Sequence, residues 1–175
     1  MINKWNFQTP SEEELHKRDQ LVAELGFSPV ICLLLVQRGI TSIEEAKKFF
    51  KPSLNDLHDP FLMPDMDKAV RRLNKALGNK EKILIYGDYD VDGTTAVSLV
   101  FKYLRPYSST LDFYIPDRYD EGYGISYKGI DYAAENGVSL VISLDCGIKA
   151  IEKIEYAKEK GIDFIICDHH MPDTT

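Results

Sequence analysis

The sequence has few cysteines, no long apolar run and no excess of basic residues. Among its 175 residues only Cys32, Cys146 and Cys167 carry thiols, too few and too scattered for a disulfide framework or a zinc site. No apolar run approaches the roughly 18 residues of a membrane span. The first residues, MINKWNFQTPSEEE, lack the basic and then apolar stretches of a signal peptide. We therefore expect a cytoplasmic protein that does not bind membranes.

The absence of a basic excess bears on the kind of substrate. The formal net charge is −7, from 21 Lys and Arg against 28 Asp and Glu. Proteins that hold nucleic acid through its phosphates usually carry a basic surface, and this composition does not indicate one. If the substrate is a polyanion, bound metal ions would have to supply positive charge locally. A hydrophobic content of 44% is enough for the core of one domain with a small attachment.

Residues 1–64 are predicted to form a small helical region that ends in an extended connection. Three helices are expected there, and their start signals are Thr9-Pro10 with Glu12, Ser28-Pro29, and a capping box of Thr41 and Glu44. The second helix, VICLLLVQR, is apolar nearly all round and is predicted to be buried, with its end at Gly39. The stretch KPSLNDLHDPFLMPDM contains three prolines and no clean periodicity, which indicates a connection along the surface.

Residues 65–175 have the pattern of an α/β domain. A helix is expected from Asp65 to Gly78, and four short apolar runs follow, at 82–86, 111–115, 140–144 and 163–167. Helical patterns separate them, at about 94–104, 126–136 with Ser126 as cap, and 148–160. Apolar strands that alternate with helices predict a parallel sheet flanked by helices on both faces, a Rossmann-like fold.

Carboxylates and imidazoles follow the strands of this predicted sheet. The side chains concerned are Asp88, Asp90 and Asp92 after the first strand, Asp145 after the third, and Asp168, His169 and His170 after the fourth. The carboxyl ends of parallel strands meet at one edge, where ligands bind. Crowded carboxylates repel one another unless a cation shares the site. Mixed carboxylate and imidazole ligands favour two ions such as manganese, which form a phosphoester-hydrolysing centre.

Other interpretations of these residues remain open at this point. Aspartates after a strand commonly form turns or cap helices, and Asp145 alone fits a cap for the helix at 148–160. Asp88 fits a hydrogen bond to backbone amides of its loop. A histidine pair is often structural or solvated, and Cys146 and Cys167 fit small buried packing residues. The coincidence of all these groups at one sheet edge favours a site.

The motif PDRYDEGYGIS offers candidate phosphate-binding groups. Gly122 and Gly124 precede a helix capped by Ser126 and could expose backbone N–H groups to a phosphate, or they could only turn the chain. Arg118 could bind a phosphate through two hydrogen bonds, or pair with Asp117 or Glu121 in solvent.

In order along the chain, GDYDVDGTT, PDRYDEGYGIS, SLDCGI and CDHH resemble the motifs of the DHH phosphoesterase superfamily. The likeness is strongest to its RecJ branch, the bacterial single-stranded-DNA-specific exonucleases. It covers 82–170, and the preceding stretch QRGITSIEEAKKFFKPSLNDLHDPFLMPDMDKAV also resembles the N-terminal region of RecJ-type enzymes.

The resemblance implies a role for each motif residue. Asp90 and Asp92 match metal ligands, Asp145 matches the aspartate that bridges two ions, and His169 matches a further ligand. His170 matches the residue that contacts the scissile phosphate, and Asp168 would orient a histidine. The implied cofactor is a pair of Mn²⁺ or Mg²⁺ ions. The implied activity is removal of nucleotides from the 5′ end of single-stranded DNA in repair and recombination, with single-stranded-DNA-binding protein as a candidate partner.

Two departures from the family pattern qualify this expectation. Pyrophosphatase relatives place a histidine four residues before the first D-x-D aspartate, where this chain has Tyr86. The chain also stops at MPDTT, before the further aspartate ligand, second domain and nucleic-acid-binding module that the family pattern implies. We therefore expect an N-terminal piece of a longer enzyme, inactive by itself.

Three alternatives compete with this hypothesis. Asp90-Val91-Asp92-Gly93-Thr94 spells the D-x-D-G-T signature of haloacid-dehalogenase-type phosphatases, although Gly87-Asp88-Tyr89 separate it from the strand. A DHH-type phosphodiesterase or phosphatase acting on small nucleotides is the second. A degenerate relative that binds DNA or proteins without cutting is the third, and the intact set of four predicted ligands argues against it.

Overall fold

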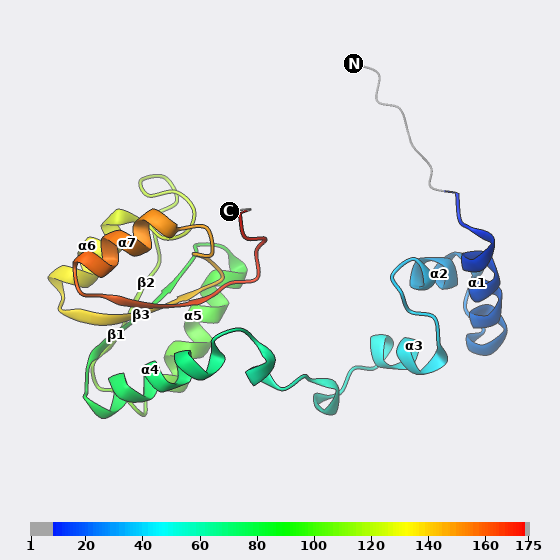
Figure 1. Ribbon diagram of the computed structural model, residues 1–175, viewed down its shortest axis with the longest axis horizontal. Coiled ribbons are helices and arrows are strands. Elements are labelled where there is room, and N and C mark those ends of the chain that lie inside the picture. Colours follow the sequence, from blue (N-terminus) through cyan, green and yellow to red (C-terminus); the bar gives the residue numbers. More distant parts are fainter. Residues whose placement is uncertain (1–8, 174–175) are drawn as a thin grey trace, which may run out of the picture. The chain divides into compact units, whose positions relative to one another are not determined.

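The structure is a computed structural model that describes residues 9–173 (Figure 1). Part of the signal-peptide prediction concerns residues 1–8, which lie outside the described residues. The chain divides into two compact units, one up to Pro60 and one from Phe61. The sequence places this division slightly later, at 64. Within the described range, no helix is long and apolar enough to cross a membrane.

The first unit contains three helices around a small core. They are α1 (Glu12–Leu25), α2 (Pro29–Val36) and α3 (Ile43–Phe50). The buried core residues are Leu21, Cys32, Leu35, Val36 and Ala46. The connection to the second unit contains two 3-10 turns, η1 (Leu54–Asp56) and η2 (Pro60–Leu62), and its residues are exposed, as the proline-containing sequence predicts.

Four sequence predictions about this unit need correction. The cap of α1 is Ser11 with Glu14, and the cap of α3 is Ser42 with Glu45, each one or two residues beyond the predicted cap. The second helix ends at Val36, before Gly39. It is also not buried all round, because three of its apolar side chains are exposed: Val30 (68%), Ile31 (45%) and Leu34 (45%).

The second unit is a four-stranded parallel sheet flanked by helices. Its elements in order are α4 (Met66–Gly78), β1 (Lys82–Gly87), α5 (Val91–Leu104), β2 (Leu111–Tyr114), α6 (Tyr127–Glu135), β3 (Val138–Leu144), α7 (Ile151–Glu159) and β4 (Asp163–Cys167). The strand order is β2-β1-β3-β4, and all three pairings are parallel. The predicted fold class is therefore confirmed.

The two faces of the sheet bury separate apolar clusters. Leu84, Tyr86 and Val141 pack with residues of α6 and α7. On the other face, Ile83, Ile85 and Ile142 pack with residues of α4 and α5. Figure 1 shows the same arrangement, with α6 and α7 on one side of the strands and α4 and α5 on the other. The continuous apolar strands follow from this two-sided burial.

The order of the strands places a switch point between β1 and β3. The chain leaves β1 for β2 on one side and later returns to form β3 on the other side of β1. A crevice at such a point, beyond the carboxyl ends of the strands, is where open α/β sheets bind ligands. Asp88 directly follows β1 and Asp145 directly follows β3, so both predicted site residues lie beside the switch point.

Candidate metal centre

Three predicted site residues come together at this edge of the sheet. Asp145, His169 and His170 each offer a ligand atom, and these atoms lie within 4.8 Å of one another. Asp145 Oδ1 is 3.1 Å from His169 Nε2. The carboxylate is largely buried, with a side chain only 10% exposed, whereas that of His169 is 77% exposed. A mostly desolvated carboxylate beside an accessible imidazole is a donor set that suits a divalent transition-metal ion.

The backbone fixes the position of the Asp145 carboxylate. Its φ is 62°, a left-handed conformation that Asp tolerates better than most residues. Its N–H donates to the Cys167 carbonyl at 2.8 Å, which ties the end of β3 to the end of β4. The N-terminal cap position of α7 is Ala150, so the alternative that Asp145 caps this helix is wrong, as is the predicted helix start at 148.

His170 is held by two hydrogen-bond partners. Its Nδ1 lies 2.7 Å from Asp168 Oδ1, and its Nε2 lies 3.3 Å from the Tyr123 hydroxyl. That hydroxyl donates its own proton to the Asp145 carbonyl at 3.2 Å, so it accepts from His170. Both ring nitrogens therefore act as donors, which favours the imidazolium form. Consistently, the Asp168 carboxylate, followed by the charges of Asp145 and Asp90, raises the pKa of His170.

Asp168 holds this segment in place. Its side chain is 2% exposed and accepts hydrogen bonds from the backbone N–H of Ile148 at 2.9 Å and of His170 at 3.0 Å. Burial raises its pKa, but these hydrogen bonds and the His170 ring outweigh burial and hold the pKa below its ordinary value. Asp168 is therefore ionised at neutral pH and fixes the orientation of the His170 ring.

Asp90 and Asp92 do not lie in an extended loop. Helix α5 starts at Val91 rather than at the predicted 94, so Asp90 is its N-cap and Asp92 lies in its first turn. Asp90 Oδ1 accepts from the N–H groups of Asp92 and Gly93, both at 3.0 Å. The capping interpretation of Asp90 is thus observed, and it leaves Oδ2 available. Neither residue belongs to the group formed by Asp145 and the two histidines.

Asp88 has a buried oxygen without a partner. The residue is 0% exposed, and its Oδ1 accepts from the Gly124 N–H at 3.3 Å. Its Oδ2 has no hydrogen-bond partner in the structure. The donor lies in the loop between β2 and α6 rather than in the loop of Asp88 itself, as predicted, and it accounts for only one of the two oxygens. A buried carboxylate oxygen is costly unless a donor or a cation compensates it.

The charges at this edge are unbalanced. Five carboxylates follow the strands: Asp88, Asp90, Asp92, Asp145 and Asp168. Across residues 9–173, neither Lys nor Arg lies within 4.0 Å of any of them, and the ion pairs that they form are with His169 and His170. Acidic groups crowded in this way repel one another. The orphaned Asp88 oxygen and the mixed oxygen and nitrogen donors therefore fit divalent cations.

The loop between β2 and α6 is organised around Glu121. Its carboxylate accepts from the Tyr114 hydroxyl at 2.9 and 3.0 Å, from the Asp117 N–H at 2.8 Å and from the Ser126 hydroxyl. Glu121 therefore does not pair with Arg118, whose guanidinium instead lies 5.1 Å from the centre of the Tyr89 ring. Arg118 remains exposed, and its contact with a phosphate stays a prediction.

The two glycines of this loop use their N–H groups within the chain. Gly124 donates to Asp88, and Gly122 donates to the Asp117 carbonyl at 3.3 Å. Both have left-handed φ values, 79° for Gly122 and 80° for Gly124, which explains why glycine stands there. The turn-forming interpretation accounts for these observations, and a contact between these glycines and phosphate stays a prediction.

Tyr86 occupies the position where pyrophosphatase relatives have a metal-binding histidine. It is buried, its hydroxyl donates to the Gly124 carbonyl at 2.9 Å, and it accepts from the Ser126 N–H at 3.0 Å. Burial raises the pKa of the phenol, so it stays protonated and is no metal ligand. Cys146 is also buried, and burial followed by the nearby carboxylates raises its pKa to about 12, which supports a packing role.

Two aromatic residues of the site were not predicted from the sequence. Tyr123 connects Asp145 to His170, and its pKa is raised to about 12 by burial and by the carboxylates of Asp88, Asp145 and Asp168. Tyr89 packs edge-on against Tyr123, with ring centroids 6.2 Å apart. Their position inside the two motifs singled out, DYD and EGYG, is the signal that could have identified them.

A pocket of about 540 Å³ opens beside His170. Its lining is Tyr123, Gly124, Ile125, Gly147, Ile148, Lys149, Ala150, Lys153, Asp168, His170 and Met171. The pocket is large enough for a nucleotide-sized group beside the His170 ring.

Glu121→Gln is expected to lower the free energy of unfolding by about 1 kcal/mol near neutral pH, since three donors lose a partly exposed ionic acceptor. Burial raises the pKa of Glu121, but its hydrogen bonds hold the pKa below the ordinary 4.5. The stabilisation is therefore present above the unfolded-state pKa and is lost as pH falls through the folded-state pKa. Urea unfolding near neutral pH and in acid measures both effects. The exposed Glu135→Gln is the matched control, and a deficit for Glu121→Gln that persists in acid would contradict the charge-based explanation.

Comparison with known proteins places the site in a family. The sequence profile described as DHH family, N-terminal domain, matches residues 82–175. The chain belongs to the DHH family. The haloacid-dehalogenase alternative is thereby excluded, and the DHH motif residues are Asp168, His169 and His170. The structure agrees with this exclusion. In haloacid-dehalogenase-type phosphatases the strand runs directly into the first aspartate of the signature, whereas here β1 ends at Gly87, before Asp90.

Curated DHH relatives share the sequence of both units. The chain is 41% identical over 169 residues to the single-stranded-DNA-specific exonuclease RecJ of Bacillus subtilis, covering 97% of the chain and 21% of that protein. It is 32% identical over 164 residues to RecJ of Escherichia coli, covering 93% of the chain and 27% of that protein. The chain therefore spans about a fifth to a quarter of the length of these relatives.

Solved RecJ structures resemble the fold. RecJ of Thermus thermophilus in complex with Mn²⁺ has a TM-score of 0.65 at 25% identity, over 92% of this chain and 22% of that one. An exonuclease RecJ bound to manganese has a TM-score of 0.57 at 31% identity, over 62% of this chain and 28% of that one.

Proposed function

We propose that this chain supplies the metal centre of a 5′-to-3′ single-stranded-DNA exonuclease that acts in DNA repair and recombination. The observation that carries the proposal is the group of Asp145, His169 and His170 at a sheet edge with five carboxylates. None of these carboxylates pairs with a lysine or arginine in the part of the chain that the structure describes. The names of the RecJ relatives and the manganese in the solved RecJ structures support both the substrate and the cofactor.

We assign the cations to the ligands implied by the family motif. Asp90, Asp92, Asp145 and His169 would hold two Mn²⁺ or Mg²⁺ ions, with Asp145 shared between them. Asp88 has a buried oxygen without a hydrogen-bond partner at this edge, and its negative charge would stabilise the bound ions without contacting them. When bound, the ions would lower the pKa of a water molecule and neutralise phosphoryl oxygens.

The remaining groups would bind and orient the substrate. His170, held by Asp168 and charged through it, would attract the scissile phosphate by its positive charge. Tyr123 keeps its proton at neutral pH and fixes the other side of the same imidazole. Arg118 would contact a phosphate, and Gly122 and Gly124 would shape the loop beneath it. The cytoplasm as location and single-stranded-DNA-binding protein as partner belong to the same proposal.

A chimera tests this function. The chain would replace the corresponding segment of B. subtilis RecJ, with which it aligns over 169 residues. We expect the chimera to release nucleotides from 5′-labelled single-stranded DNA with Mn²⁺ and to be inactive with EDTA. The chain alone is expected to be inactive. A chimera that folds and binds Mn²⁺ yet hydrolyses only dinucleotides would instead support the small-nucleotide alternative.

A further inference from the structure

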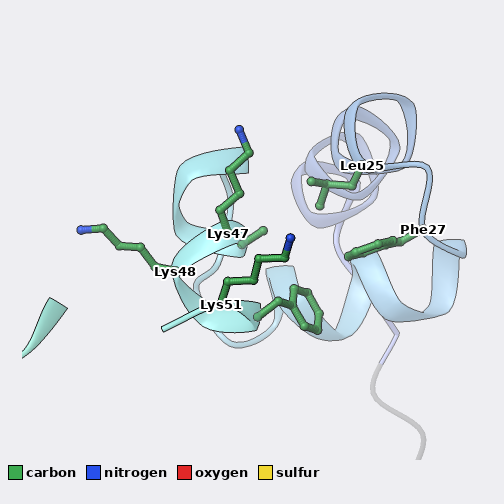
Figure 2. A pocket seen from close by; sticks show the side chains of 7 residues that line it. Leu25, Phe27, Lys47, Lys48 and Lys51 are labelled. Carbon is green, nitrogen blue, oxygen red and sulfur yellow. The ribbon is translucent and has the colours of Figure 1, made fainter. Parts of the chain in front are cut away.

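A second pocket lies within the first unit, and none of its lining residues belongs to the proposed metal centre. Its volume is about 380 Å³, and its lining is Leu25, Phe27, Ala46, Lys47, Lys48, Phe50 and Lys51. We call it the lysine-rimmed pocket. Figure 2 shows Leu25 and Phe27, from the end of α1 and the segment after it, on the opposite side of the pocket from α3 and its C-cap residue Lys51. Lys51 extends toward Phe27, whereas Lys48 points away.

The walls of the lysine-rimmed pocket are apolar and accessible. Phe27 is 38% exposed and Phe50 is 47% exposed, and their rings meet edge to face with centroids 5.3 Å apart. The remaining wall residues are Leu25 and Ala46 together with the stems of the lysines. Apart from the lysine ammonium groups, no side chain of the lining offers a hydrogen-bond donor or acceptor.

Two of the three lysines at the rim, Lys47 and Lys51, have no carboxylate partner among residues 9–173. Within the described range, neither Lys47 nor Lys51 has a carboxylate within 4.0 Å, and Lys48 faces Asp56 only at 3.9 Å. Three cations within five residues run against the net charge of −7. Lysines near the end of a helix also complement its dipole, which accounts for some of the charge. The dipole does not account for the exposed phenylalanine pair that the lysines surround.

We propose that the lysine-rimmed pocket docks an acidic segment of a partner protein, with a bulky apolar side chain in the pocket and carboxylates on Lys47 and Lys51. Charge complementarity selects an anionic partner. A nucleobase fits less well, because its polar edge would be buried against walls that offer only ammonium groups. The volume suits one anchor side chain with its flanks, as in peptide recognition, rather than the broad interface between domains of one chain.

Fluorescence anisotropy with the 175-residue chain tests this proposal. The probe is a labelled peptide with one phenylalanine between two runs of aspartate. One control peptide has alanine in place of phenylalanine, and another has asparagine in place of every aspartate. Labelled oligothymidylate is titrated in parallel. The test variant is Lys47→Glu with Lys51→Glu, and its matched control is Lys75→Glu with Lys102→Glu, which removes exposed lysines from the last turns of α4 and α5.

The expected result is saturable binding of the phenylalanine peptide, weakened about tenfold by the test variant and unchanged by the control variant. Both control peptides should bind at least about tenfold more weakly, since one lacks the apolar side chain for the pocket and the other lacks the carboxylates for the lysines. Equal binding of all three peptides, or no effect of Lys47→Glu with Lys51→Glu, would overturn the proposal. Binding of oligothymidylate but not of the peptide, dependent on the same lysines, would overturn it in favour of nucleic acid. None of these outcomes depends on the metal centre.

Discussion

Asp145→Asn is expected to reduce the Mn²⁺-dependent nuclease activity of the RecJ chimera on the order of 10³-fold or more. The substitution removes the charge of the carboxylate that lies 3.1 Å from His169 and that we propose both ions share. Asn is chosen because it tolerates the left-handed backbone at this position. Alanine would add about 1 kcal/mol of backbone strain to the loss of the ligand. The measurement is single-turnover cleavage of 5′-labelled single-stranded DNA.

The matched control for this prediction is Asp120→Asn. Asp120 lies on the exposed surface of the loop between β2 and α6, where it faces Lys128 at 3.6 Å. Its replacement should leave cleavage within about twofold of the parent, since an exposed ion pair contributes little. Cleavage by Asp145→Asn within about tenfold of the parent would remove Asp145 from the proposed centre.

His170→Ala is expected to lower the cleavage rate of the chimera by about 10²- to 10³-fold while leaving Mn²⁺ affinity nearly unchanged. Geometry alone places both histidines in reach of a metal ion, since both belong to the group with Asp145. The hydrogen bonds of the two histidines distinguish their roles. His170 uses Nδ1 toward Asp168 and has a raised pKa, and an imidazolium ring cannot bind a cation.

Asp168→Asn supplies the internal check on this division of roles. Loss of the carboxylate should return the pKa of His170 toward its ordinary value, which NMR titration of the ring protons can measure in the metal-free chain. Because the folded-state pKa of His170 is raised, the stability linked to its protonation is present below the unfolded-state pKa of histidine, while Asp168 is ionised, and is lost as pH rises through the folded-state pKa. If His170→Ala weakens Mn²⁺ binding as much as His169→Ala does, the assignment of His170 to the phosphate is wrong.

The sheet and the edge at which the site lies could be predicted from sequence because their signals are redundant. Every strand is a short apolar run, and helical patterns separate successive runs, so the parallel sheet and the meeting of the strand ends at one edge follow together. The placement of Asp145, Asp168 and the two histidines at one edge needed no further information. Their motif order then identified the family.

The details that were wrong depend on ambiguous local signals. Thr41 with Glu44 and Ser42 with Glu45 both match the spacing of a capping box, and the structure uses the second pair. An extended loop after β1 and an early helix start are equally compatible with GDYDVDG, and packing decides between them. A Cβ atom on Gly93 would lie 2.4 Å from the Asp88 carbonyl oxygen, so glycine lets the first turn of α5 approach this closely.

The residues that were missed act through contacts distant in sequence. Tyr123 meets Asp145 and His170 across 22 and 47 residues, and no local pattern predicts such a bridge. The exposed face of α2 is a similar case, because its sequence is apolar on every side and has no periodicity to show which side is covered.

Calorimetric titration of Mn²⁺ into the 175-residue chain tests the metal centre most directly. It should be done for the parent, for His169→Ala, and for His58→Ala, which alters an exposed histidine of the connection between the units. The proposed centre predicts binding by the parent and by His58→Ala, with affinity at least about tenfold weaker in His169→Ala. Binding by His169→Ala as tight as that of the parent would contradict the assignment of the site.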